Sequence, residues 1–267
     1  MSVKSAVARM IEATPVLSDL FLYRSFGRRY NTCRGVYQTV QEANAASPKS
    51  VESGYNQSVI GDSDSVSQIT ANKDSETLDP KDYPVLFWLS AIFPDVRRLF
   101  NLGGNVGLEF YAYRKKLAFP DTLEWTVCEI PEIVDKGAEL ARERGEERLD
   151  FTTDFEDAEN TDLLLTCGTL QYLEKSIDRM IGGLNERPQH VLINRTPIYD
   201  GDPYITLQYI GYAVTPYRIQ NREELIAGMR AEGYHLIDEW KDSRDLKIPF
   251  HPECYVPGYR GMYFRSD

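Results

Sequence analysis

The sequence predicts an α/β fold with a doubly wound, mostly parallel sheet, an antiparallel final strand and a helical N-terminal extension. From residue 98 onward, short apolar segments alternate with helical ones, the order that parallel strands with crossover helices produce. Segment 162–167 (DLLLTC) has no polar alternation, as expected of a strand covered on both faces. The connection from 240 to 261 has no helical pattern, which indicates an antiparallel return at the end of the sheet.

The first 80 residues are predicted to form a helical extension that could serve as a lid, and residues 81–267 the main domain. Helical periodicity covers 3–13, and a second short helix is predicted over 35–46. From 47 to 79 the residues Ser, Asp, Asn and Gly dominate. We therefore expect a long connection there, with one short helix near 63–72.

Helices and strands alternate in the predicted main domain. Pro94 ends the first helix, and Pro131 fits the first turn of a later one. The expected helices are 85–92, 108–116, 131–144, 173–185 and 222–232. The expected strands are 98–102, 124–130, 149–152, 162–167, 190–194, 234–240 and 261–264.

Composition places the chain among globular proteins. With 267 residues, 42% hydrophobic and 27% charged, it is long and apolar enough for a real core. This length fits one large α/β domain with an appendage, or two small domains. The formal net charge of −11 makes the surface repel phosphate backbones, so general nucleic-acid binding is disfavoured.

Segment 1–40 is basic despite the acidic whole, and aromatic residues are interleaved in it. The basic residues are Lys4, Arg9, Arg24, Arg28, Arg29 and Arg34, and the aromatic ones are Phe21, Tyr23, Phe26 and Tyr30. One interpretation is a docked helix with a solvated basic face. The other is an arm that contacts an anionic membrane surface peripherally, or an anionic acceptor.

Cysteine usage and hydropathy indicate the compartment. The four cysteines show no pair at metal-ligand spacing, so no metal site is expected. The first residues lack the apolar stretch of a signal peptide. The longest apolar run, 85–93, is shorter than the roughly 20 residues of a membrane-spanning helix. These features predict a cytoplasmic protein.

Segment 99–107 (LFNLGGNVG) combines a strand, a glycine-rich turn and the start of a helix. Such a turn lets the backbone approach a ligand without interference from Cβ atoms, and it directs helix N–H groups toward that ligand. Ligands of parallel sheets bind at the carboxyl ends of the strands, where this turn lies. The alternative is a tight strand-to-helix turn that binds nothing.

Acidic residues follow the next two predicted strands. Glu129 comes 22 residues after Gly107, where a carboxylate can accept hydrogen bonds from ribose hydroxyls. Asp154 and Phe155 follow the third strand and offer a polar group and an apolar face to an adenine ring. The alternatives are a helix N-terminal charge for Glu129 and a helix cap for Asp154.

The glycine pattern discriminates between cofactors. A dinucleotide site needs three glycines, and the first of them would fall on Leu102. S-adenosylmethionine (SAM) carries no pyrophosphate and does not need the full set. The turn therefore favours SAM.

Several motifs resemble those of known enzymes. LFNLGGNVG resembles the first motif of the SAM-dependent methyltransferases, and WTVCEIPEIVDKG is similar to a strand end of small-molecule O-methyltransferases. FTTDFEDAENTDLLLTCGTLQYLEK resembles their third and fourth motifs. Over about residues 30–265, including CRGVY, GYN and TPYRIQNREELIAGMRAEGYHLIDEW, the chain is similar to a bacterial methyltransferase family associated with surface-polysaccharide gene clusters. The resemblance implies a Rossmann-like fold and O-methylation of a small molecule or saccharide.

The resemblance also implies a SAM site. Its turn would contact the methionine part, Glu129 the ribose, and residues 166–168 would line the sulfonium side. The implied cofactor residues are Asn101, Gly103, Gly104, Asn105, Gly107, Glu129, Ile130, Asp154, Phe155, Cys167 and Gly168. Two positions depart from the motif, because Asn101 stands where an acidic residue is usual and Asn105 where a glycine is usual.

The sequence indicates the methyl acceptor and the general base less specifically than it indicates the cofactor. His251 lies in a predicted loop and is the candidate general base, whereas His190 and His235 lie in predicted strands. By the resemblance, Gln171 and Tyr172 would lie on the acceptor side of the site. Tyr199 and Tyr204 belong to a tyrosine cluster that could stack on a sugar or an aromatic ring, or equally form core.

Two alternatives to an active methyltransferase remain open. Asn101 and Asn105 keep open a methyltransferase-like binding or scaffold protein without activity. A nicotinamide-dependent oxidoreductase is disfavoured by the incomplete glycine signature.

Overall fold

The computed structural model describes residues 15–49, 52–53 and 78–267 of the chain. The chain divides into two compact units, each assembled from separate segments. The small unit comprises Met1–Tyr55, Pro197–Arg222 and Ser243–Tyr259. The large unit comprises Asn56–Thr196, Glu223–Asp242 and Arg260–Asp267.

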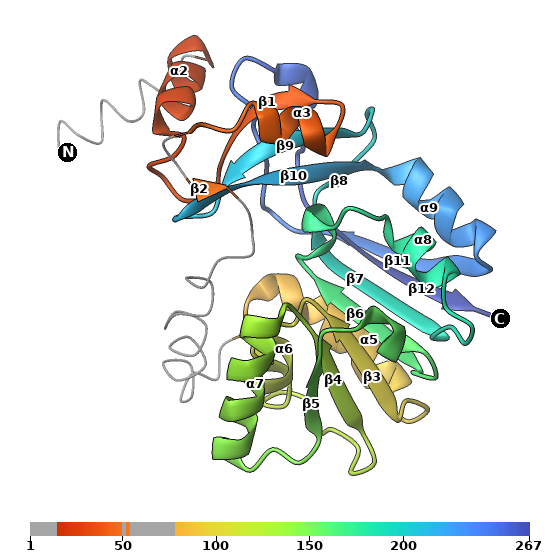
Figure 1. The fold of residues 1–267 in the computed structure, drawn as a ribbon. Helices are drawn as coiled ribbons and strands as arrows, with labels where there is room; N and C mark the ends of the chain where they lie inside the picture. The colour runs from red at the N-terminus through yellow and green to blue at the C-terminus, as the bar shows by residue number, and fades with distance from the viewer. Residues whose placement is uncertain (1–14, 50–51, 54–77) are drawn as a thin grey trace, which may run out of the picture. The chain divides into compact units, whose positions relative to one another are not determined.

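The large unit is built on a seven-stranded sheet with the order β11-β12-β7-β6-β3-β4-β5 (Figure 1). Its strands are β3 (Arg98–Leu102), β4 (Glu124–Cys128), β5 (Leu149–Thr152), β6 (Leu163–Cys167), β7 (His190–Thr196), β11 (Tyr234–Lys241) and β12 (Arg260–Ser266). The strands from β7 to β5 pair in parallel, whereas β12 pairs antiparallel with both β7 and β11. The predicted mostly parallel sheet with an antiparallel final strand is thereby confirmed.

The helices of the large unit are α5 (Tyr83–Ile92), α6 (Leu108–Tyr113), α7 (Pro131–Arg144), α8 (Ile177–Gly182) and α9 (Arg222–Ala231). Of these, α5, α6 and α7 pack with strands of the sheet in one apolar core. Trp125 of β4 and Tyr113 of α6 are among its largest fully buried side chains. Phe119 stacks on Trp125 with the ring centroids 5.5 Å apart. This packing fixes the strand ends from which the candidate site residues project.

Helix α8 is shorter than the predicted helix over 173–185. A 3-10 turn, Leu170–Tyr172, precedes it, and Ser176 occupies its N-cap position. The helix ends at Gly182 with Gly183 as its C-cap. Two consecutive glycines have low helix propensity, which explains the early end.

The small unit carries its own sheet of order β1-β9-β10-β2, with β8 paired to β10 (Figure 1). The strands are β1 (Thr32–Tyr37), β2 (Glu52–Ser53), β8 (Ile198–Tyr199), β9 (Tyr204–Tyr209) and β10 (Ala213–Asn221). The helices are α2 (Pro15–Ser25) and α3 (Val40–Ala45). Phe26 and Ala43 pack against Leu207 and Val214 in its core. Strands from the N-terminal part of the chain and from residues 198–221 therefore meet in one sheet.

The predicted helix over 35–46 is wrong in its first half, where β1 pairs antiparallel with β9. Thr39 sets the true start of α3, because its hydroxyl accepts the N–H of Glu42 at 3.1 Å. The Glu42 carboxylate in turn accepts the N–H of Gln38 at 2.9 Å. This reciprocal arrangement is a variant of the capping box, and long-range strand pairing decides the residues before it.

The predicted boundary near residue 80 differs from the division seen in the structure. Segments Pro197–Arg222 and Ser243–Tyr259 join the N-terminal part, because β9 pairs with β1 and β10 pairs with β9. The predicted helices over 3–13 and near 63–72 lie outside the described residues. No helix within the described ranges is long and apolar enough to cross a bilayer.

Candidate functional site

The glycine-rich turn lies between β3 and α6 in the large unit. Gly103 has a φ of +73°, and a Cβ built there would stand 2.0 Å from Thr169 Oγ1. Asn105 also has a positive φ, of 52°. Asparagine tolerates the left-handed region better than most residues, so the backbone accepts Asn105 where the motif usually has glycine. Its side-chain oxygen accepts the N–H of Val106 at 2.8 Å.

The Glu129 carboxylate ties this turn to the end of β4. Its Oε1 accepts the N–H of Asn105 at 3.1 Å, and its Oε2 accepts the N–H of Ile130 at 3.1 Å. Burial raises the pKa of the Glu129 carboxyl, and these two donors oppose that shift. The structure thus brings together the turn and the acidic strand end that the sequence singled out. Each carboxylate oxygen has a further lone pair with which to accept a ligand hydroxyl.

Asp154 and Phe155 follow β5 as predicted. Asp154 is exposed and caps the 3-10 turn Phe155–Ala158 by accepting the N–H of Glu156 at 3.1 Å. Phe155 is half-buried and contacts Phe100 edge-on, with the ring centroids 5.8 Å apart. The cap considered as an alternative for Asp154 is therefore present, and its contact with adenine stays a prediction.

Buried polar atoms gather where β3 and β6 end. Asn101 is fully buried, and its Nδ2 donates to the Leu165 carbonyl at 3.4 Å. Asn101 Oδ1, Thr166 Oγ1 and Gln171 Oε1 are buried without a hydrogen-bond partner among the described residues. A Cβ at Gly104 would stand 2.3 Å from Asn101 Oδ1, so this amide supports the turn from beneath. Since an unpaired buried polar atom costs about 1–3 kcal/mol, such a group is typical of a ligand site.

Cys167 and Gly168 close the end of β6. Burial raises the pKa of the Cys167 thiol to about 12, which keeps it protonated and unreactive at neutral pH. Gly168 donates its N–H to the Asn194 carbonyl at 2.9 Å. Gln171 Nε2 donates to the Gly168 carbonyl at 2.6 Å, and Tyr172 lies in the same 3-10 turn. These hydrogen bonds hold the residues at the carboxyl end of β6 in place.

A buried ion pair that the sequence analysis missed lies in the same unit. Arg195, with a φ of 57°, donates from Nη2 to Glu109 Oε1 at 2.5 Å. Its Nε lies 3.5 Å from Asp82 Oδ1. Burial raises the pKa of Glu109 to about 7. The sequence signal that could have revealed this ion pair is Glu109 itself, the one charged residue of α6, which stands between Leu108 and Phe110.

The predicted acceptor tyrosines and His251 belong to the small unit. The Tyr199 hydroxyl donates to the Asp202 carbonyl at 2.5 Å, and the Tyr204 hydroxyl to the Cys254 carbonyl at 2.6 Å. Both hydroxyls therefore brace loops of their own unit. His251 is half-buried and precedes the 3-10 turn Pro252–Cys254, with its Nδ1 3.0 Å from Glu253 Oε1.

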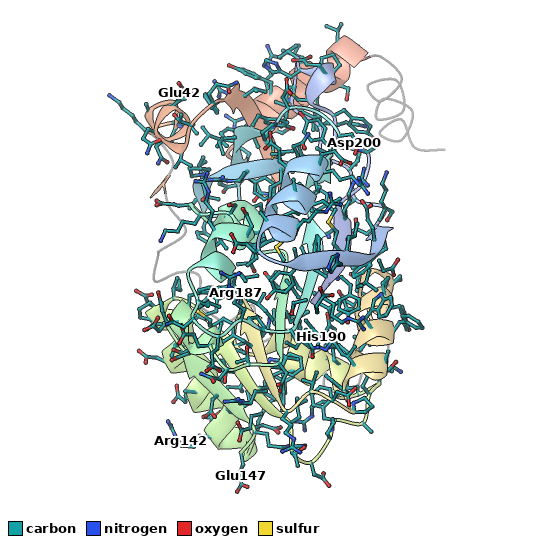
Figure 2. All side chains as sticks on the ribbon, turned by 90° about the vertical axis from the view of Figure 1, so that its right-hand side faces the viewer. Glu42, Arg142, Glu147, Arg187, His190 and Asp200 are labelled. Carbon is teal, nitrogen blue, oxygen red and sulfur yellow. The ribbon has the colours of Figure 1, made fainter. Side chains whose placement is uncertain are left out.

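The other two histidines belong to the large unit. His190, labelled in Figure 2, starts β7 and is buried, with its Nδ1 2.7 Å from the Tyr263 hydroxyl. Burial lowers the pKa of the His190 imidazole, which favours its neutral form. His235 lies in β11, exposed, 3.5 Å from the Asp267 carboxylate. Both occupy strands, as the sequence analysis expected.

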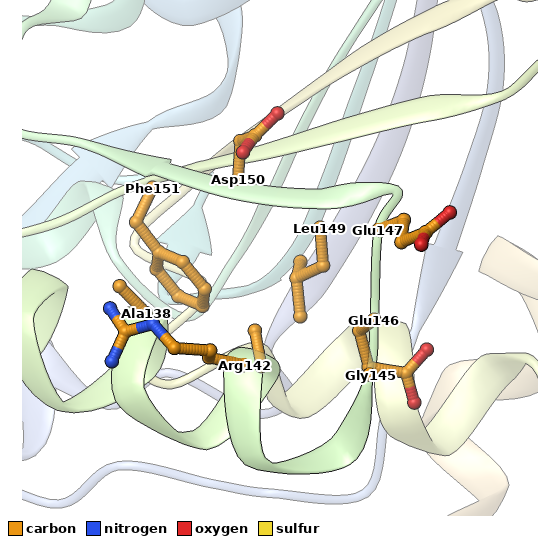
Figure 3. Close-up of a pocket in the computed structure, with 9 residues that line it drawn as sticks. Ala138, Arg142, Gly145, Glu146, Glu147, Leu149, Asp150 and Phe151 are labelled. Atoms are coloured by element: carbon orange, nitrogen blue, oxygen red, sulfur yellow. The ribbon is translucent and has the colours of Figure 1, made fainter.

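A separate pocket of about 480 Å³ lies between α7 and β5 (Figure 3). Its lining includes Arg142 and Gly145 at the end of α7 and Leu149 and Phe151 on β5. The predicted site residues do not line it. It opens beside the amino-terminal part of β5, whereas ligands of parallel sheets bind at carboxyl ends. We therefore do not assign this pocket to the candidate site.

Comparisons with known proteins agree with this architecture. No protein-family model matches the chain, and no curated protein matches it. Among solved structures, it is similar to the 1,6-didemethyltoxoflavin-N1-methyltransferase of Burkholderia thailandensis with bound 1,6-didemethyltoxoflavin and S-adenosylhomocysteine (SAH). The TM-score is 0.51 at 19% identity, covering 90% of this chain and 97% of that chain.

A second similar structure is the magnesium protoporphyrin IX methyltransferase of Synechocystis with bound SAH. The TM-score is 0.47 at 11% identity, covering 69% of this chain and 81% of that chain. The first likeness, together with the strand order of the large unit, shows that the chain has the Rossmann-like fold of a methyltransferase.

Proposed function

We propose that the chain is a SAM-dependent methyltransferase that methylates an oxygen of a small molecule or saccharide. The observation that carries the proposal is the hydrogen bond from the Asn105 N–H to the Glu129 carboxylate, which ties the glycine-rich turn to the end of β4. This arrangement offers a ribose-binding carboxylate beside a backbone that a ligand can approach closely. The methyltransferase of Burkholderia thailandensis, which shares the fold, holds SAH.

The described residues fit SAM. In the proposed complex Glu129 accepts the ribose hydroxyls, and the turn from Gly103 to Gly107 contacts the methionine part. Ile130, Asp154 and Phe155 border the adenine, and residues 166–168 face the sulfonium. When bound, SAM supplies an electrophilic methyl group. The chain's own contribution is to orient the acceptor in line and to take up its proton.

Calorimetric titration with SAM, SAH and NADH tests the proposal. We expect micromolar binding of SAM and SAH, about −8 kcal/mol, and no heat from NADH. Binding of NADH alone would support an oxidoreductase instead. A folded protein that binds none of the three would support the scaffold alternative, with Asn101 and Asn105 as the departures that explain the loss.

His251 is the proposed general base, because its side chain is 40% exposed and its imidazole has a carboxylate partner in Glu253. Changing His251 to alanine should leave SAH affinity unchanged and lower turnover by about 10²-fold or more. The measurement is SAH release with a saccharide acceptor of the kind that surface-polysaccharide synthesis supplies. His235→Ala, at another exposed histidine, is the matched control. Full activity of the His251 variant would end its candidacy.

We also propose a cytoplasmic location with peripheral membrane contact through segment 1–40. Helix α2 exposes Val16, Leu17 and Phe21 by 69%, 47% and 45%. Arg28 and Arg29 are exposed in the turn that follows. Apolar side chains beside arginines suit an anionic lipid surface.

Co-sedimentation tests this contact. We expect the protein to bind vesicles with 30% phosphatidylserine. In the Phe21→Ser variant, the fraction of protein bound to these vesicles should fall by at least half. Phosphatidylcholine vesicles are the control. Equal binding to both vesicle types, or none to either, would contradict the proposal.

A further inference from the structure

Helix α6 has one charged side chain, and that side chain is buried. Glu109 lies in the first turn of α6, two residues after Gly107 of the glycine-rich turn, and is 5% exposed. Its Oε1 accepts a hydrogen bond from Arg195, whereas its Oε2 is buried with no hydrogen-bond partner among the described residues. A buried carboxylate needs charges and donors around it to replace its lost hydration. For Glu109 this replacement is incomplete.

The side chains around Glu109 combine two carboxylates with one cation. The Arg195 guanidinium that contacts Glu109 also faces Asp82, with its Nε 3.5 Å from Asp82 Oδ1. Asn194 Nδ2 donates to Asp82 Oδ1 at 3.1 Å, but an amide adds no charge. We call Glu109, Asp82 and Arg195 the buried charge cluster. With both carboxyls ionised, these three residues carry one net negative charge.

Other titratable groups near the buried charge cluster leave this net charge unchanged. The Tyr113 hydroxyl and the Cys167 sulfur lie 3.8 Å apart beside it. Burial raises the pKa of the Tyr113 hydroxyl well above its ordinary value and that of the Cys167 thiol to about 12, so both are neutral at pH 7. Lys81 lies 2.6 Å from the Asp79 carboxylate, and the charges of this pair cancel.

The buried charge cluster borders the end of β6. Its charges act on the Cys167 thiol, and Arg195 also hydrogen-bonds the sulfur. A Cβ built on Gly168 would stand 3.7 Å from the Arg195 Cβ. All of these residues belong to the large unit. Since residues 166–168 face the sulfonium in the proposed complex with SAM, the cluster acts on the same part of the site.

Glu109 is the member of the cluster that changes its charge near neutral pH. Burial raises the pKa of its carboxyl from 4.5 to about 7, Arg195 opposes this shift and Asp82 adds to it. The cluster is therefore neutral when Glu109 is protonated and carries one negative charge when it is ionised. A cation bound nearby favours the ionised form.

We infer that Glu109 is a specificity-determining residue whose carboxylate favours SAM over SAH, because SAM has a positively charged sulfur and SAH does not. The inference rests on the proposed function and deepens it. Glu129 is assigned to the ribose, which both ligands share. Asn101, where the methyltransferase motif usually has an acidic residue, adds no charge. Transfer of the methyl group removes the attraction to Glu109, which favours release of the product.

The test compares the affinities of SAM and SAH for the full chain at pH 5.5 and pH 7.5 by calorimetric titration. SAM lowers the pKa of Glu109, so its affinity should rise with pH relative to that of SAH. We expect the ratio of the two affinities to increase about 3- to 10-fold over this range. Titrations at pH 7 in phosphate and in imidazole, which differ in ionisation enthalpy, count the protons that each ligand releases.

The Glu109→Gln variant makes the test specific. Glutamine keeps the shape and an oxygen for the Arg195 donor, but it does not ionise. The increase of the SAM-to-SAH ratio with pH should disappear, SAM should release fewer protons than from the natural chain, and SAH affinity should stay unchanged. Glu124→Gln, at an exposed carboxylate at the start of β4, is the control and should keep the increase. Glu129 and the α-amino group of the ligand titrate alike in both variants, so the difference between them isolates Glu109.

Two results would overturn the inference: a SAM-to-SAH ratio of the natural chain that does not rise with pH, or an equal rise in Glu109→Gln. The first result needs only the natural chain, so it decides the question even where the variant does not fold. A protein that binds SAM and SAH but shows either result retains the proposed function and loses the inference. A protein that binds neither ligand loses both.

Discussion

Replacing Glu129 by alanine should weaken SAH binding by about 100-fold while the chain still folds. Charge-assisted hydrogen bonds contribute about 1.5–3 kcal/mol each, and two ribose hydroxyls are expected to bind this carboxylate. A loss of about 2.7 kcal/mol corresponds to that factor. The Asn105 and Ile130 N–H groups also lose their acceptor, so the variant should melt a few degrees earlier. Calorimetry with SAH and thermal unfolding measure the two effects.

Glu124→Ala is the matched control for this variant. Glu124 is the first residue of the same strand and is exposed, so its removal should change neither SAH affinity nor the melting temperature. Glu129→Gln should lie between alanine and the natural residue, since an amide keeps the shape and one acceptor oxygen. Unchanged SAH affinity in Glu129→Ala would remove the turn and the β4 end from the cofactor site.

Replacing Arg195 by methionine should destabilise the protein by about 3–5 kcal/mol at pH 8, because it removes one partner of a buried ion pair. The change leaves the Glu109 carboxylate, 5% exposed, without its cation. It also removes the guanidinium that lies near Asp82. The free energy of unfolding, from urea titration, is the measurement.

The deficit of this variant should depend on pH. The pKa of Glu109 is already raised to about 7 in the folded protein, above its ordinary value of 4.5. A raised carboxyl pKa contributes stability fully below about 4.5, and this contribution is lost as the pH rises through 7. Without Arg195 the pKa rises further, so the deficit should be smaller at pH 5 than at pH 8.

Two comparisons control the Arg195 result. Arg142→Met, at an exposed arginine, should leave stability unchanged. The double variant Arg195→Met/Glu109→Gln should recover most of the lost free energy of unfolding, because it removes the unpaired Glu109 charge as well as the cation. A single variant as stable as the natural chain at pH 8, or a deficit that is equal at both pH values, would contradict the prediction.

Local patterns account for the parts of the fold that the sequence predicted well. The bounds of β3 and α7 agree with the prediction to the residue. Pro131 stands in the first turn of α7, and Gly145 ends it in a left-handed conformation. The meeting of the glycine turn with Glu129 was likewise predictable, because adjacent parallel strands place their carboxyl ends at one edge.

The rest depends on contacts between distant residues. The second half of β1 was predicted as helix, because the partner strand β9 lies far along the chain. Glu109 and Arg195 are 86 positions apart, and no periodicity links two such residues. Strands β9 and β10 were interpreted only as a tyrosine cluster, because buried polar residues such as Thr206 and Gln208 interrupt the expected alternation of apolar and polar residues.

The three-segment origin of the small unit has a consequence for biosynthesis. Its first strand leaves the ribosome long before its partner, since Thr32 pairs with Tyr209, and its last segment ends at Tyr259. Closing so long a loop is slow, and unpaired strand edges invite aggregation meanwhile. The nascent N-terminal segment must therefore stay unassembled, with Phe26 and the edge of β1 uncovered, until almost the whole chain has been translated. During synthesis, aggregation through this uncovered edge therefore competes with folding of the small unit.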